Sequence, residues 1–402
     1  MVISDIKNRL NGINWDFDFM IEYDNKSMHP FNCRKYYSYP ATFIPEIPYA
    51  LIEILSKKGN TVVDPFGGIG TTFMQALILE RKPFSFDINP IASDVCNTLY
   101  KLMDPELNTK DISTHLLNIC NEYDEAYSYT KNISEQRVNL GSWYHKSTFN
   151  ELAFLCQTFD DMHVSTIRDV MELVLTSILV PLSGQTKGWA YIADNVKPKD
   201  SELKDKKLIE KFKNTLTVLL HDIEEYKESL SNTYRSFYEN IKHTPRVIED
   251  SITCRHLPEG TVDLIITSPP YPRMIDYIKS QRLSFDFLNI NFKNYVTREI
   301  GARYKRQRKD ILDTYEKEIL SVNIEMEKIL KNLGFLCVVL PDYNEDDDRK
   351  AVIDKIVNDY KNNYNYRLIF DTRRYIPSHR RTLSIQWATL VNEKIYIFQK
   401  EG

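Results

Sequence analysis

Cysteine is scarce in this 402-residue chain, and the cysteines present show no pairing pattern. They are scattered, without a CxxC motif and without histidines at matching spacing. Disulfide frameworks and structural zinc sites both need such spacing, so the sequence argues against both. We therefore expect reduced, mostly buried thiols and no metal site. The cysteines are Cys33, Cys96, Cys120, Cys156, Cys254 and Cys337.

Long hydrophobic runs are also missing. No apolar stretch approaches the roughly 18 residues that span a bilayer, and the opening MVISDIKNRLNGINWDFDF lacks the basic-then-apolar order of a signal peptide. With 42% hydrophobic residues, the chain can still bury a full core, in one large domain with an insertion or in two domains. These features predict a soluble, cytoplasmic globular protein with no membrane partner.

Charge is nearly balanced over the whole chain, since the formal net charge is −4. Residues 271–310 depart from this balance, with ten lysines and arginines against four acidic residues. A basic segment of this kind suits a polyanion such as nucleic acid. The alternative interpretation is a solvated helix face.

The order of patterns along the chain predicts an α/β fold with an insertion. After about residue 59 come a strand, a glycine loop, a helix and a second strand, the opening unit of a doubly wound sheet. We divide the chain into a first part of the α/β domain (1–99), a mostly helical insertion (100–245) and the second part of the domain (246–402). Helical spacing is clearest in residues 111–130, 165–179 and 205–230, and an acidic surface loop is expected at 344–350.

The glycine loop DPFGGIGTT carries the first functional signal. Gly68 and Gly70 lie between a strand and a helix, where a missing Cβ lets the backbone approach a ligand. Asp64 ends its strand, and Asp87 ends the next one about 20 residues on, where a carboxylate can accept both ribose hydroxyls. The loop lacks GxGxxG spacing and a following lysine, which argues against phosphate binding. Asp64 could instead face the ammonium group of S-adenosylmethionine, or it could simply cap a helix or turn.

The second signal is the sequence TSPPY, which ends a buried strand. A nucleobase amino group is a poor nucleophile, because its lone pair is delocalised into the ring. Acceptors aimed at its N–H bonds would localise that lone pair, and Ser268 Oγ and the carbonyl of Pro269 are candidates. Consecutive prolines hold the turn rigid, and Tyr271 offers a face for stacking an extruded base. The plain alternatives are a turn-forming serine, a proline strand stop and a core tyrosine.

Together, DPFGGIGTT and TSPPY resemble the two motifs of the amino-group DNA methyltransferases, which modify N4 of cytosine or N6 of adenine. The resemblance implies a Rossmann-like fold with a seven-stranded mixed sheet, helices on both faces and a mostly helical insertion. It implies S-adenosylmethionine as cofactor. The implied cofactor-binding residues are Thr42, Asp64, Pro65, Phe66, Gly68, Gly70, Thr71, Asp87 and Asp250, with Tyr39, Pro40 and Ala41 near the methionine end. The implied catalytic residues are Ser268, Pro269, Pro270 and Tyr271.

The choice of target base depends on one residue. Serine at the first catalytic position is typical of the cytosine-N4 enzymes of this family, so Ser268 favours direct methyl transfer to N4 of cytosine, with no metal and no covalent enzyme intermediate. Two alternatives remain open, an adenine-N6 enzyme and a catalytically silent DNA-binding module of the same fold. An RNA substrate is a further, less favoured reading.

The basic segment and the insertion are expected to meet double-stranded DNA. A role in restriction–modification, or in host or phage DNA marking, would add a possible cognate restriction endonuclease as partner. Base readout is assigned to the insertion, whose loop at 184–199 mixes basic and aromatic residues, although core burial of those aromatics is the alternative. A second strip is formed by Arg373, Arg374, Arg380 and Arg381, with surface salt bridges as the alternative. The expected phosphate contacts are Arg273, Lys279, Arg282, Arg303, Lys305 and Arg306.

Overall fold

A seven-stranded sheet forms the centre of the computed structural model, which describes residues 2–17, 28–185, 197–249, 257–376, 390 and 392–402. The strand order is β3-β2-β1-β4-β5-β7-β6. The first five strands in this order run parallel, and β7 is antiparallel to both of its neighbours. This mixed sheet confirms the predicted Rossmann-like methyltransferase fold. The strands are β1 (Thr61–Asp64), β2 (Lys82–Asp87), β3 (Val247–Glu249), β4 (Val262–Thr267), β5 (Leu330–Asp342), β6 (Tyr366–Tyr375) and β7 (Asn392–Lys400).

Strands β1 and β4 occupy the middle of the sheet because they are apolar on both faces. Val62 of β1 pairs with Leu264 of β4, and both side chains are at most 1% exposed. The strands end in polar residues, Asp64 and Thr267. Because the two strands are parallel, these residues lie at the same edge of the sheet.

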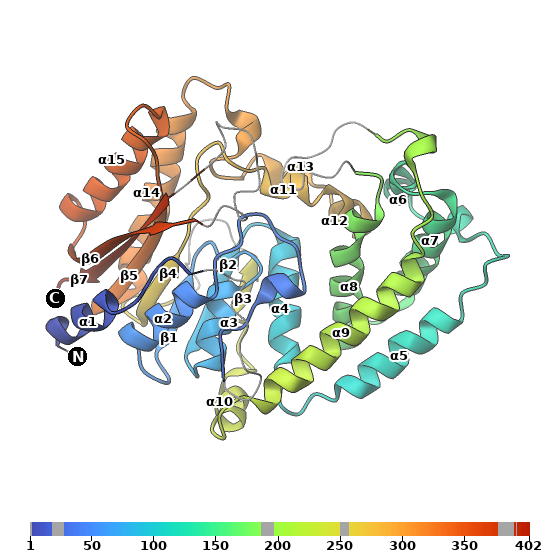
Figure 1. The fold of residues 1–402 in the computed structure, drawn as a ribbon, viewed down its shortest axis with the longest axis horizontal. Helices are drawn as coiled ribbons and strands as arrows, with labels where there is room; N and C mark the ends of the chain where they lie inside the picture. Colours follow the sequence, from blue (N-terminus) through green and yellow to red (C-terminus); the bar gives the residue numbers. More distant parts are fainter. Residues whose placement is uncertain (1, 18–27, 186–196, 250–256, 377–389, 391) are drawn as a thin grey trace.

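Helices cover both faces of the sheet (Figure 1). Side chains that alternate along β4 divide between two apolar clusters: Leu264 and Ile266 belong to one, and Ile265 to the other. The first cluster is covered by α1 (Ile3–Asn11), α2 (Glu46–Leu55), α3 (Thr71–Ile78) and α4 (Pro90–Leu102). The second is covered by α14 (Ile311–Ile329) and α15 (Asp348–Asn362).

The segment between α4 and β3 is mostly helical and forms the lobe opposite α14 and α15 in Figure 1. Its helix α8 packs against α4 of the α/β part, so the apolar faces of both belong to one continuous core. Its elements are α5 (Thr109–Asn121), η2 (Tyr129–Asn132), α6 (Glu135–Val138), η3 (Asn139–Trp143), α7 (Lys146–Asp161), α8 (Thr166–Leu182), η4 (Asp200–Glu202), α9 (Leu208–Glu228) and α10 (Tyr234–Ile241).

The helical lobe is also tied to the segment that follows the catalytic loop. Helix α12 (Arg282–Phe287) packs against α8 and α6. Arg137 of α6 is 2% exposed, donates to the backbone carbonyl of Phe287 at 2.6 Å, and forms an ion pair with Asp160. The helical lobe thus packs against, and supports, the segment that follows the catalytic loop. The remaining short elements are η1 (Cys33–Lys35), α11 (Tyr277–Ser280), α13 (Lys293–Val296) and η5 (Arg303–Lys305).

Two local expectations differ from the structure. Helical spacing over 111–130 corresponds to a helix only as far as Asn121, after which turns and the 3-10 helix η2 follow. An acidic loop was expected at 344–350, but helix α15 begins within this range, at Asp348. Asp347 is its N-cap and accepts a hydrogen bond from the backbone N–H of Arg349 at 2.9 Å. Within the described ranges, no helix is long and apolar enough to cross a bilayer.

Candidate active site

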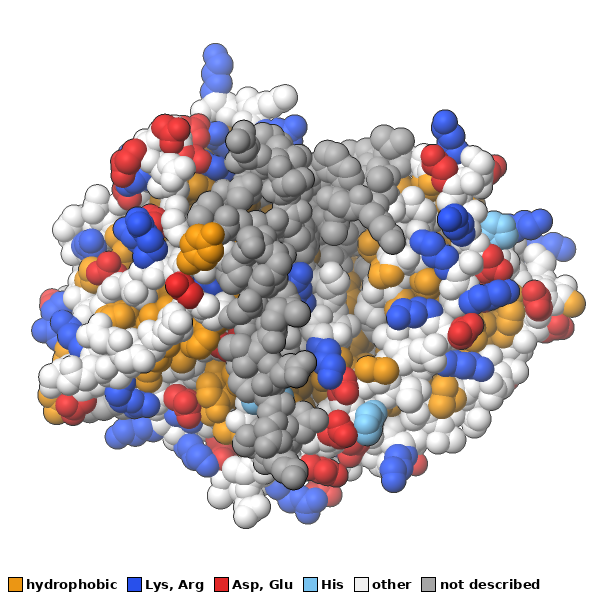
Figure 2. Space-filling model, viewed as in Figure 1, with side chains coloured by type: hydrophobic (Ala, Val, Ile, Leu, Met, Phe, Trp, Pro, Cys, Tyr) orange, Lys and Arg blue, Asp and Glu red, His pale blue; other side chains and the backbone are white. Residues whose placement is uncertain are grey.

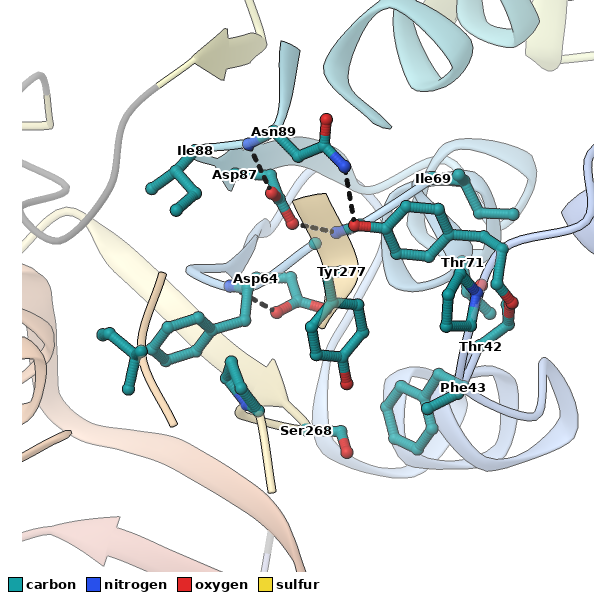
Figure 3. A pocket seen from close by; sticks show the side chains of 18 of the residues that line it. Thr42, Phe43, Asp64, Ile69, Thr71, Asp87, Ile88, Asn89, Ser268 and Tyr277 are labelled. Carbon is teal, nitrogen blue, oxygen red and sulfur yellow. Dashed lines mark hydrogen bonds between the residues drawn. The ribbon is translucent and has the colours of Figure 1, made fainter. Parts of the chain in front are cut away.

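A pocket opens at the carboxyl ends of β1, β2 and β4, the edge where open α/β sheets bind ligands. Asp64, Asp87 and Ser268, which end or follow these three strands, all line it. Its space, including solvent at the mouth, is about 840 Å³, which suits a nucleoside-sized ligand. In the view of Figure 3, Asp87 lies toward one end of the pocket and Ser268 toward the other.

Asp64 is fixed by three hydrogen bonds. It accepts from the backbone N–H of Phe66 at 3.0 Å, from Thr72 Oγ1 at 2.7 Å and from Thr267 Oγ1 at 2.9 Å. The first two bonds close its own loop, as the capping interpretation expected. The third joins the cofactor loop to the residue directly before Ser268. Burial raises the pKa of Asp64 to about 6, although these hydrogen bonds oppose the rise.

The glycines of the loop differ in what they face. A Cβ on Gly68 would meet the ring of Tyr39 at 3.5 Å beside the pocket. A Cβ on Gly70 would lie 2.3 Å from Sγ of Cys96 on α4, and Gly70 has a φ of +88°. Gly70 does not line the pocket. Its missing Cβ therefore serves close packing of the loop on α4, and our expectation that it admits a ligand does not match the structure.

Asp87 is held at the other side of the loop. Its carboxylate accepts from the backbone N–H of Gly68 at 2.9 Å and from that of Asn89 at 2.8 Å. Asn89 in turn donates to the hydroxyl of Tyr39 at 3.2 Å. Burial raises the pKa of Asp87 to about 6, against the effect of both backbone donors. Each carboxylate oxygen keeps acceptor capacity for a ligand hydroxyl.

The catalytic loop is held by residues that are distant in sequence. The backbone carbonyl of Pro270 accepts from Tyr315 Oη on α14 at 2.9 Å. Tyr271 Oη donates to Glu393 on β7 at 2.7 Å, and Glu393 is ion-paired with the buried Arg374. Burial and the neighbouring Glu393 raise the pKa of Tyr271 well above its usual value. Tyr271 therefore keeps its proton and directs it to Glu393.

This direction of donation has a consequence for Ser268. Ser268 Oγ donates to Tyr271 Oη at 3.4 Å, because the proton of Tyr271 is already given to Glu393. A hydroxyl whose proton is engaged offers its lone pairs to other donors. Ser268 Oγ is thus set up as an acceptor toward the pocket that it lines.

Most of the residues singled out in the sequence share this pocket. Pro269 and Tyr271 do not line it, and neither does Gly70. Asp250 and Cys254 lie outside the described residues, as do Arg380, Arg381 and most of the loop at 184–199. The expected residues that line the pocket are Tyr39, Pro40, Ala41, Thr42, Asp64, Pro65, Phe66, Gly68, Thr71, Asp87, Ser268 and Pro270.

The basic segment divides into buried and exposed cations. Arg303 is 5% exposed and Lys305 is 6% exposed, and Lys305 Nζ donates to the backbone carbonyl of Glu299 at 2.6 Å. These two residues therefore do not lie on a phosphate-contacting surface, contrary to expectation. Arg306 is exposed.

The partly exposed cations of this segment already have partners. Arg273 is ion-paired with Asp348 at 2.8 Å, and Lys279 Nζ lies 3.9 Å from the centre of the Tyr304 ring. Arg282 lies 3.9 Å from a carboxylate oxygen of Asp286. On the face in Figure 2, basic side chains are interspersed with acidic ones over the coloured atoms.

The two described members of the second arginine strip, Arg373 and Arg374, are both paired with carboxylates. Arg374 is 2% exposed, binds Glu393, and donates to the backbone carbonyl of Trp15 at 3.2 Å. Arg373 is ion-paired with Asp342 at 2.5 Å. The salt-bridge alternative is therefore confirmed for both described members.

Several pocket residues were not found from the sequence. Asn89 lies two residues after Asp87 and could have been read as part of the same strand end. Tyr277 and Glu299 lie within the basic segment, where the surrounding lysines and arginines directed attention to DNA. The ring of Tyr277 stacks on that of Tyr39 with centroids 5.9 Å apart. No local pattern signals this contact, because it joins residues far apart in the chain.

Comparisons with known proteins agree with the two loops. A DNA methylase family of the N6/N4 type matches residues 5–97. The type II methyltransferase M.BsoBI of Geobacillus stearothermophilus is 27% identical over 290 residues, which is 67% of this chain and 54% of that protein. The chain thus matches about half the length of this relative.

Two further relatives have the same description. The type II methyltransferase M.MjaII of Methanocaldococcus jannaschii is 22% identical over 88% of this chain and 76% of its own length. M.MvaI of Kocuria varians, also a type II methyltransferase, is 20% identical over 64% of this chain and 57% of its own length. These matches, with the two loops that meet in one pocket, support the resemblance of this chain to the amino-group DNA methylases.

Proposed function

We propose that this chain transfers a methyl group from S-adenosylmethionine to an exocyclic amino group of a base in double-stranded DNA, and that the target is N4 of cytosine. One observation carries the proposal: Thr267 Oγ1 donates to Asp64 at 2.9 Å, which joins the cofactor loop and the catalytic loop at one pocket. A methyl donor and an acceptor amino group must meet within reacting distance, and this junction brings their two loops together.

The residues of the pocket fit the proposed cofactor. Its lining contains the carboxyl groups of Asp64 and Asp87 beside the cofactor loop and, among the described residues, no lysine, arginine or histidine, which suits a cationic ligand. Asp87 at the end of β2 has acceptor capacity for ribose hydroxyls. Pro65, Phe66 and Ile88 supply apolar surface. When bound, S-adenosylmethionine supplies the electrophilic methyl group.

Ser268 prepares the amino group. Its Oγ has its own proton directed to Tyr271, so it accepts an N–H of the target base and draws the nitrogen lone pair out of conjugation. The rigid prolines and the bond from Tyr315 to Pro270 hold the loop in place. Pro269 does not line the pocket, so a second acceptor must come from elsewhere.

The preference for cytosine N4 is based on Ser268. Family members with serine at this position are typically cytosine-N4 enzymes, whereas adenine-N6 enzymes usually carry Asp or Asn. The relatives are named type II methyltransferases, and on this basis we extend the proposal to restriction–modification, with a cognate endonuclease as partner. The helical lobe is proposed to contribute to recognition of the target sequence.

The test is methyl transfer from labelled S-adenosylmethionine to mixed-sequence duplex DNA, followed by identification of the modified base and its sequence context. We expect N4-methylcytosine, and N6-methyladenine alone would refute the choice of base. Ser268→Ala should lower kcat by about 100-fold or more, by analogy with the loss of one oxyanion donor, and should leave cofactor binding intact. Tight DNA binding without transfer to any duplex would instead support a silent module.

A further inference from the structure

Glu299 is a buried carboxyl group in the pocket that the motifs do not account for. It lies between α13 and η5, is 3% exposed, and lines the pocket. One oxygen, Oε1, accepts from the backbone N–H of Tyr277 at 2.6 Å. The other, Oε2, is buried and has no hydrogen-bond partner among the described residues.

The ammonium group of Lys305 does not bind this carboxyl group directly. Lys305 Nζ donates to the backbone carbonyl of Glu299 and to that of Thr297, not to the side chain. Buried acceptors without a donor cost free energy, so an unpartnered oxygen at a pocket wall indicates that a ligand supplies the donor. Burial raises the pKa of Glu299 to about 8, and the charge of Asp276 adds to this rise, whereas the backbone N–H groups of Tyr277 and Ile278 and the charge of Lys305 oppose it.

The segment that carries Glu299 is hydrogen-bonded to the chain just after the catalytic loop. Asp64 and Asp87 end β1 and β2, on the side of the cofactor loop. Glu299 lies two residues before Gly301, whose carbonyl accepts from the backbone N–H of Arg273 at 2.8 Å. Arg273 lies two residues after Tyr271, the last residue of the SPPY turn, so this bond ties the Glu299 segment to the catalytic loop.

We infer that the carboxyl group of Glu299 binds the target base at its amino group and the adjacent ring nitrogen, and so supplies the second acceptor beside Ser268 Oγ. This inference rests on the proposed function. The carbonyl of Pro269 was the expected second acceptor, but Pro269 does not line the pocket, and the neighbouring Pro270 carbonyl already accepts from Tyr315. Glu299 supplies this second acceptor from the segment between α13 and η5.

The hydrogen-bond donors and acceptors of the target base and of the Glu299 carboxyl group are complementary. The amino group of cytosine or adenine donates, and the neighbouring ring nitrogen accepts. A protonated carboxyl group offers one acceptor and one donor, and so complements this pair. Because the amide of glutamine offers the same pair, Glu299→Gln should preserve binding of the base, whereas Glu299→Met keeps the shape and removes the hydrogen bonds.

The experiment measures coupling between Glu299 and the amino group. Once the target site is mapped, duplexes are prepared with the target base and with an analogue that lacks the amino group, 2-pyrimidinone for cytosine or purine for adenine. We expect wild-type protein and Glu299→Gln to bind the amino-bearing duplex about tenfold more tightly than the analogue, and Glu299→Met to bind both equally. Calorimetric binding of S-adenosylmethionine should be unchanged in both variants, which also reports that they are folded.

The inference is overturned, with the proposed function intact, if Glu299→Met retains the amino-group preference or if it loses cofactor binding while remaining folded. In the latter case the carboxyl group contacts the cofactor. Wild-type protein that transfers no methyl group to any DNA refutes the proposed function instead. Loss of the preference in Glu299→Gln as well as in Glu299→Met would also contradict the acceptor–donor pairing.

Discussion

The two loops of the pocket are held in different ways. The cofactor loop closes on itself: Asp64 accepts from Phe66 and Thr72, and the backbone N–H of Gly70 donates to the carbonyl of Gly67 at 2.9 Å. The catalytic loop depends on Tyr315 of α14 and Glu393 of β7, 45 and 122 residues further along the chain. The first loop is thus encoded locally, whereas the second is positioned by tertiary structure.

The largest effect is expected from disrupting the local packing of the cofactor loop. Gly70→Ala places a methyl group 2.3 Å from Cys96 Sγ at a φ of +88°. We expect a loss of about 1–2 kcal/mol for the left-handed backbone and about 1–3 kcal/mol more for overpacking. Urea denaturation should show this loss, and cofactor affinity should fall with it.

Gly59→Ala is the matched control, because Gly59 has a φ of +81° and open space where a Cβ would be placed. It should lose only the backbone part, about 1–2 kcal/mol, with cofactor affinity unchanged. Equal losses in the two variants would show that the contact with Cys96 does not constrain the loop.

The junction of the two loops should give the next largest effect. Thr267→Val and Thr72→Val each remove one buried hydroxyl donor from Asp64. Both should lose about 1.5–3 kcal/mol of stability, the range for hydrogen bonds to charged groups. Only Thr267→Val should also lower kcat beyond its effect on cofactor affinity, since it alone releases the catalytic loop. Identical kinetic effects would mean that the two loops act independently.

Cofactor binding should weaken in acid through Asp87 and Asp64. Burial raises the pKa of each to about 6, so the free protein protonates both as pH falls through 6. Affinity should be steady above pH 7 and fall by up to about tenfold per pH unit below 6 for each carboxylate that must be ionised. Asp87→Asn should bind weakly at pH 8 and show a shallower decline.

Stability should follow the opposite trend. The folded pKa values exceed the ordinary value of 3.8, so the stability contributed by protonating these groups is fully present below about pH 4 and is lost as pH rises through 6. If the cofactor binds more weakly at pH 5.5 while the free energy of unfolding is not reduced, the weaker binding results from protonation of Asp64 and Asp87 and not from unfolding of the protein. Pronounced unfolding below pH 6 would contradict this assignment.

The same contrast explains what the sequence could predict. The cofactor loop follows from adjacent residues, and Asp64, Gly68 and Asp87 indeed line the pocket. The sheet was also predictable, because short β-branched apolar runs such as VDLIIT, bounded by turn residues, indicate buried strands. Glu299 and Tyr277 were missed because their role arises from contacts across the fold. Lys305 was misplaced for a related reason: its ammonium group is buried on backbone carbonyls that no spacing rule reveals.

The smallest effect should come from the long-range anchors of the catalytic loop. Tyr271→Phe removes the donor to Glu393 and frees the proton of Ser268, whereas Tyr315→Phe removes only the bond to the Pro270 carbonyl. Tyr315→Phe should cost about 0.5–1.5 kcal/mol of stability, and Tyr271→Phe, which removes a donor to a charged group, about 1.5 kcal/mol. Tyr271→Phe should also lower kcat several-fold at unchanged cofactor affinity, because Ser268 is no longer held as an acceptor. If Tyr315→Phe lowers kcat as much as Tyr271→Phe, placement of the loop matters and the direction of the serine proton does not.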